Sequence, residues 1–82
     1  PVLDEFPSGC VGWTGGQIRL HAGTGNATQV IGSAQTGDNI YFIHSPQNGY
    51  SYVTVTDSNF VAKSGGWLRD GFDPALCTQN LP

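Results

Sequence analysis

The chain has 82 residues, a formal net charge of −3 and only 11% charged residues, less than half the share of about 25% that is usual in soluble domains. Its three cations are too few for the basic patch that nucleic acids or anionic membrane surfaces require. No apolar run approaches the roughly 20 residues of a membrane span. The chain is therefore expected to fold as one small domain that has neither nucleic acid nor a membrane as partner.

Residues 1–9 contain two prolines and two acidic residues and show no hydrophobic periodicity. This composition predicts an extended N-terminal arm, followed by a domain over residues 10–77 and a tail over residues 78–82. Because the first residue is Pro1 rather than a methionine, we expect a processed, mature form.

The middle of the chain alternates between short segments rich in β-branched and aromatic residues and loops rich in Gly, Asn and Ser. No window has the apolar periodicity of a helix, whereas polar and apolar residues alternate as in half-buried strands. This pattern predicts an all-β fold, a small barrel or sandwich of five to six short strands. The predicted strands cover residues 17–21, 29–34, 39–44, 50–56, 60–62 and 67–69.

One short helical turn is predicted near the C-terminus, over residues 73–77. Asp73 is a favourable N-cap residue and Pro74 suits the first helical position.

The two cysteines, Cys10 and Cys77, have a spacing that fits no metal-binding pattern. The favoured interpretation is one disulfide that ties the N-terminal arm to the C-terminal tail. Such a link would contribute about 4 kcal/mol in the chain-entropy model, and it predicts an oxidising compartment and hence a secreted protein. The alternative is a nucleophilic cysteine paired with His21 or His44, although nothing near either cysteine is electropositive.

The segment from Ile18 to Ile43 resembles the opening of bacterial-type SH3-like domains, whose pattern runs L-N-V-R-S-G-P-G, then V-I-G, then G-D-x-V. In this chain His21 stands where the family usually has Arg, and Thr24 stands where it has Pro. Two later segments, Gly49–Val53 and Gly66–Leu68, resemble the family's G-W-x-x-V and G-W-V strands. The remaining matches are Ile18, Leu20, Gly23, Gly25, Val30-Ile31-Gly32 and Gly37-Asp38.

This resemblance implies a small SH3-like β-barrel that acts as a secreted or envelope-targeting module. Many such domains flank cell-wall hydrolases and hold peptidoglycan, often its peptide bridges, in a shallow groove. The implied partner is a cell-wall polymer or a protein, and the implied state is a monomer without a cofactor.

A neutral polar ligand is best held by aromatic rings, which offer flat apolar area and small polar groups. The candidate ligand contacts are Tyr41, Tyr50, Tyr52, Trp13 and His21. The alternative is that the tyrosines are ordinary half-buried strand residues, and that His21 is a solvated or hydrogen-bonded surface residue. No metal site is expected, since the two histidines lack acidic neighbours at ligand spacing.

The acidic residues lie in predicted turns, a cap and the arm, so they form no obvious catalytic pair, although Asp57 and Asp70 are one pair to check. We therefore expect a non-catalytic binding module. The alternative is a small secreted interaction protein, such as an effector or an inhibitor of a hydrolase or protease. It would present a rigid loop over residues 45–49 or 56–65. Asn26 is an N-x-T glycosylation acceptor if the source glycosylates.

Overall fold

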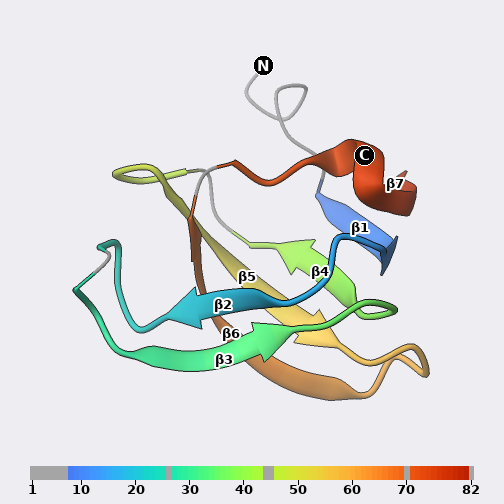
Figure 1. Cartoon of the computed structure of the whole chain (residues 1–82), viewed down its shortest axis with the longest axis horizontal. Helices are drawn as coiled ribbons and strands as arrows, with labels where there is room; N and C mark the ends of the chain where they lie inside the picture. The colour runs from blue at the N-terminus through green and yellow to red at the C-terminus, as the bar shows by residue number, and fades with distance from the viewer. Residues whose placement is uncertain (1–7, 26, 44–45, 70, 82) are drawn as a thin grey trace.

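The computed structural model describes residues 8–25, 27–43, 46–69 and 71–81. The described elements are seven β-strands and one short 3₁₀ helix (Figure 1). In chain order they are β1 (Gly9–Trp13), β2 (Ile18–His21), β3 (Val30–Ala34), β4 (Asn39–Phe42), β5 (Tyr50–Thr56), β6 (Ala62–Arg69), η2 (Pro74–Leu76) and β7 (Cys77–Leu81). None of the described elements is a helix long and apolar enough to cross a bilayer.

All seven strands belong to one antiparallel sheet with the order β3-β2-β6-β5-β4-β1-β7. The all-β prediction is thus confirmed, but the prediction of five to six strands is wrong. No ladder between described residues joins the outermost strands β3 and β7, so the sheet is open and a closed barrel is not confirmed.

Strands β1 and β7 lie near the two ends of the described chain, where no strand was predicted. The boundary predicted after residue 9 falls inside β1, and residues 78–81 belong to β7. Ser8 N–H donates to Leu81 O over 2.9 Å, so the described end of the arm is held by the sheet. Residues 1–7, the rest of the predicted arm, lie outside the described residues.

The prediction of two short strands over 60–62 and 67–69 is wrong, because residues 62–69 form one long strand, β6. The sequence between them, with Gly65 and Gly66, has the composition of a turn but forms regular pairs with β5. A Cβ atom on Gly66 would lie 2.9 Å from Leu20 Cβ and 3.0 Å from His21 O. These glycines therefore permit close contact between strands rather than a change of direction.

The core includes Ile40 of β4 and the alternating valines of β5, together with residues of β1, β2, β3 and β6. Ile40 and Val55 are cross-strand partners, and both are about 1% exposed. Val53 and Leu20 complete the centre of this cluster. Full burial of side chains of this size contributes about 1.5–3 kcal/mol each, so these residues carry much of the sheet's stability.

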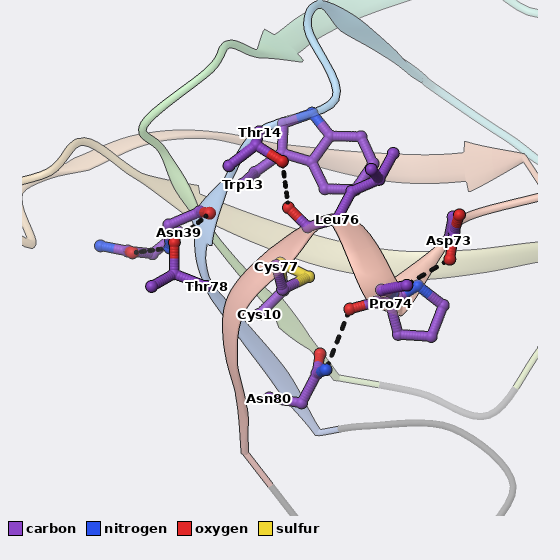
Figure 2. Close-up of a disulfide and its surroundings, with 12 residues drawn as sticks. Cys10, Trp13, Thr14, Asn39, Asp73, Pro74, Leu76, Cys77, Thr78 and Asn80 are labelled. Carbon is purple, nitrogen blue, oxygen red and sulfur yellow. Dashed lines mark hydrogen bonds between the residues drawn. A yellow bond between two sulfur atoms is a disulfide. The ribbon is translucent and has the colours of Figure 1, made fainter.

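The predicted disulfide between Cys10 and Cys77 is confirmed, and polar contacts surround it (Figure 2). Thr14 Oγ1 donates to Leu76 O over 2.6 Å, and Asn80 Nδ2 donates to Pro74 O over 2.9 Å (Figure 2). Further along β7, Thr78 Oγ1 donates to Gly12 O over 3.0 Å. The exposed strand β7 is thus fixed to β1 by both a covalent bond and hydrogen bonds.

The predicted helical turn is also confirmed, as the 3₁₀ helix η2. Asp73 is its N-cap, and Asp73 Oδ1 accepts a hydrogen bond of 2.9 Å from Ala75 N–H. Pro74 occupies the first helical position, as its fixed φ favours. The turn carries the chain from the end of β6 to β7 at the far edge of the sheet (Figure 1).

Candidate binding groove

An open groove with a volume of about 700 Å³ lies between β2 and the end of β6. Its walls come from these two strands, from the end of β1, from the β2–β3 loop and from the segment after β6. The lining residues are Trp13, Gln17, Ile18, Arg19, His21, Thr28, Val30, Leu68, Arg69, Gly71 and Phe72. They include apolar, aromatic, polar and cationic side chains, which suits an extended ligand of mixed polarity.

The groove opens where the pairing of two neighbouring strands ends. β5 and β6 pair over seven residue pairs, but β2 and β6 share the single pair His21↔Trp67. The strands touch there because Gly66 leaves room for Leu20. Beyond that point the described residues of β2 and β6 form no further ladder, and both strands line the groove instead.

Stacked aromatic rings form one wall of the groove. The rings of Trp13 and Phe72 stack with centroids 4.9 Å apart, and Phe42 meets Phe72 edge-on at 5.2 Å. Trp13 Nε1 donates to Gly16 O over 2.6 Å, which satisfies the indole N–H. Trp13 is only 4% exposed. Its ring therefore supports the wall from within rather than projecting into solvent.

His21 ends β2 and lines the groove, and its ring is held from two directions. Its Nδ1 atom lies 3.2 Å from Thr28 O, and the Tyr50 ring packs edge-on with centroids 5.9 Å apart. The Thr28 hydroxyl in turn donates to Gly25 O over 2.5 Å. The β2–β3 loop is thereby tied to the groove, so the histidine and Thr28 form a preorganised polar side.

Two of the three cations in the chain line this groove. Arg19 and Arg69 are exposed, and within the described part of the chain neither takes part in an ion pair. The third cation, Lys63, lies on β6 away from the groove and contacts Asp38 Oδ2 at 2.5 Å. No acidic residue is among the lining residues that the structure describes, and Asp70, which follows Arg69 in the sequence, lies outside the described residues. The described lining of the groove therefore carries two cationic side chains in a chain whose net charge is −3.

The structure brings together two of the five predicted ligand contacts. Trp13 and His21 line the groove, while Tyr50 is buried behind His21. Tyr52 packs edge-on against Trp67 with centroids 5.4 Å apart, and Tyr41 lies opposite Thr54; neither tyrosine lines the groove.

His44, the predicted partner of a nucleophilic cysteine, and Asn26, the predicted glycosylation acceptor, lie outside the described residues. Both cysteines are in the disulfide, so a nucleophilic cysteine is ruled out. No group of three or more His, Cys, Asp or Glu side chains able to hold a metal occurs within the described ranges.

The sequence analysis missed Arg19, Arg69 and Phe72, which contribute to the groove. Arg19 could have been found from the sequence, because it alternates with apolar residues on a predicted half-buried strand and is one of only three cations in the chain. Arg69 and Phe72 had no such signal, since Arg69 ends a predicted short strand, Phe72 precedes the predicted helical turn, and their distance from β2 is set by the tertiary fold.

Comparison with known proteins gives a family but no activity. No curated protein and no solved structure matches the chain. One family model, described as "Domain of unknown function (DUF4453)", matches residues 1–82. Because this match covers the whole sequence, the chain belongs to the DUF4453 family.

Proposed function

We propose that this protein is a secreted, non-catalytic binding module that holds an extended polar ligand, such as a cell-wall peptide or glycan, in the groove between β2 and β6. The observation that carries the proposal is the groove itself, where a rigid aromatic wall faces a polar side built from His21 and Thr28. Such preorganised rings and polar groups bind with little loss of conformational entropy.

The Cys10–Cys77 disulfide supports the extracellular part of the proposal, since such bonds persist in oxidising compartments. The resemblance to SH3-like domains supports the class of ligand. Its matching segments form the β2–β3 hairpin and the β4–β5–β6 meander, and His21 and Val30 in these segments line the groove. We accordingly propose that the open seven-stranded sheet is a variant of the SH3-like barrel.

The test is co-sedimentation of the full chain with insoluble peptidoglycan, chitin and cellulose. Two variants at the exposed start of β3 serve as a matched pair. Val30 lines the groove and is 46% exposed, whereas Ile31, 52% exposed, does not line it. Val30→Trp should fill the groove and abolish sedimentation, while Ile31→Trp should sediment like the wild type. A chain that stays in the supernatant with all three polymers contradicts the proposal.

A second candidate function is that of a small interaction protein, which the turn between β5 and β6 favours. Phe60 and Val61 at its tip are 62% and 59% exposed. The turn is rigid, because Asp57 Oδ1 accepts hydrogen bonds from the backbone N–H groups of Asn59 and Val61. Exposed apolar side chains on a fixed turn offer a preorganised contact to a protein partner.

This candidate is tested by inhibition assays against lysozymes and proteases with the wild type and Phe60→Ala. Inhibition that is lost in Phe60→Ala, without sedimentation on any polymer, would favour the interaction protein over the binding module. Lys63 is not part of this contact, since it lies within β6 and pairs with Asp38.

A further inference from the structure

We infer that the groove between β2 and β6 selects ligands that carry carboxylate groups, and that Arg19 and Arg69 are the residues that recognise them. The inference rests on the proposed binding function and names the chemistry of the ligand. The ligand class is an extended acidic peptide.

The first argument is the placement of the two arginines. Starting from the pair His21↔Trp67, Arg19 lies two residues back along β2 and Arg69 two residues forward along β6. Because the strands are antiparallel, both offsets point in the same direction, and the two residues stand at equivalent positions on the two sides of the groove. Two positive charges on the two sides of a groove repel each other, and an anion bound between them reduces this repulsion.

The second argument is that the described acidic residues are engaged elsewhere. Asp38 accepts hydrogen bonds from Gln35 N–H and from Lys63 Nζ. The Asp57 carboxylate stabilises the β5–β6 turn, and that of Asp73 caps η2. Within the described ranges, therefore, no side-chain carboxylate of the chain neutralises the groove.

The third argument concerns which anion fits. Guanidinium groups bind planar carboxylates through two parallel hydrogen bonds. The adjacent apolar side chains of Ile18, Val30 and Leu68 offer contacts to the aliphatic parts of a peptide, and Gln17 and Thr28 offer polar groups to its backbone. A nucleic acid is disfavoured because the chain has a net charge of −3. An acidic peptide matches both the positive and the apolar parts of the lining.

The experiment titrates the ¹⁵N-labelled full chain with two synthetic peptides and follows amide chemical shifts. One peptide is acetyl-Gly-Glu-Gly-Glu-Gly-amide, and the other replaces both glutamates with glutamine. The acidic peptide should shift the amides of β2 and of the end of β6 and bind at least about tenfold more tightly than the neutral one. Its affinity should fall as salt is added.

Arg19→Gln and Arg69→Gln should each weaken binding of the acidic peptide by about tenfold, and the double variant should bind both peptides alike. Lys63→Gln is the matched control, since it removes the same charge away from the groove and should leave binding unchanged. Native amide spectra of all variants establish that they are folded.

Three results would overturn the inference. The first is equal chemical-shift changes of the groove amides with both peptides. The second is unchanged affinity of the arginine variants for the acidic peptide. The third is the absence of any chemical-shift change with the acidic peptide. Co-sedimentation with a polymer that Val30→Trp abolishes would still support the proposed groove function in each of these cases. The two proposals therefore fail separately.

Discussion

The rings of Trp13 and Phe72 stack with 4.9 Å between their centroids, although the two residues are 59 positions apart in the chain. Trp13 ends β1, and Phe72 lies between β6 and η2. This contact fixes the segment after β6 against the first strand and so forms the wall of the groove. Its loss is expected to affect both stability and groove shape.

Replacement of Phe72 by Ala should lower the free energy of unfolding by about 2–3 kcal/mol, somewhat less than for a fully buried Phe because Phe72 is half-buried. The measurement is urea unfolding followed by far-UV circular dichroism. Phe72→Leu, which keeps most of the volume, should lose about 1 kcal/mol. Equal stability of the wild type and Phe72→Ala would show that the stack contributes nothing.

Reduction of the disulfide should destabilise the domain by about 4 kcal/mol, because the bond closes a loop with a sequence separation of 67. Urea unfolding with and without a phosphine reductant measures the effect. The double variant Cys10→Ala/Cys77→Ala should unfold at the low urea concentration of the reduced protein and should not respond to reductant. An unchanged unfolding midpoint after complete reduction would contradict this expectation.

Gly66→Ala should be strongly destabilising, by about 2 kcal/mol or more. The new Cβ atom would lie 2.9 Å from Leu20 Cβ and 3.0 Å from His21 O, so β2 would have to move away from β6. Gly25→Ala is the control, since its nearest contact would be an ordinary 3.9 Å to Thr28 Cγ2. Thermal unfolding compares the two, and similar melting temperatures would argue against the close contact of the strands.

Phe60→Gly should be more stable than Phe60→Ala by about 1 kcal/mol. Both changes remove the exposed ring, but Phe60 has φ 64°, a left-handed conformation that Gly adopts freely and Ala does not. The difference in urea unfolding midpoints between the two variants isolates this backbone effect. If Phe60→Ala matched or exceeded Phe60→Gly, the residue would not be under this constraint.

Replacement of Asp38 should lower the free energy of unfolding more than replacement of its ion-pair partner Lys63. Asp38→Ala should cost about 2–3 kcal/mol, because the Asp38 carboxylate is buried and also accepts from Gln35 N–H. Lys63→Ala should cost about 1 kcal/mol, since the lysine side chain is 34% exposed. Thermal unfolding of the two variants at neutral pH measures the difference, and a larger loss for Lys63→Ala would contradict it.

Local sequence patterns predicted the parts of the fold that local physics determines. The alternation over Tyr50–Thr56 gave the bounds of β5 correctly, and the Asp73-Pro74 pair located η2. The strand β7, in contrast, is polar and mostly exposed. It forms because β1 and the disulfide hold it in place, and no pattern in its own residues indicates this. The twin glycines of β6 suggested a turn for a similar reason, since their role depends on a neighbour distant in sequence.

The candidate site was less predictable than the fold. Aromatic composition pointed to Tyr41 and Tyr52, but neither of these residues, on β4 and β5, lines the groove. Arg19 and Arg69 lie on β2 and β6, which pair with each other at a single residue pair. The sequence shows that the chain has three cations. Only the tertiary fold determines that two of them line one groove while the third, Lys63, forms an ion pair with Asp38.

The hydrogen bond from Ser8 N–H to Leu81 O has a consequence for protein engineering. Because these residues are neighbours in space, polypeptide entering at Ser8 and leaving after Leu81 would pass through adjacent points on the surface. The domain is thus suited to insertion into a surface loop of a host protein with little separation of the loop ends. Ser8 and Leu81, where the described part of the domain begins and ends, are not among the residues that line the groove between β2 and β6, so in that setting they would leave it open to a ligand.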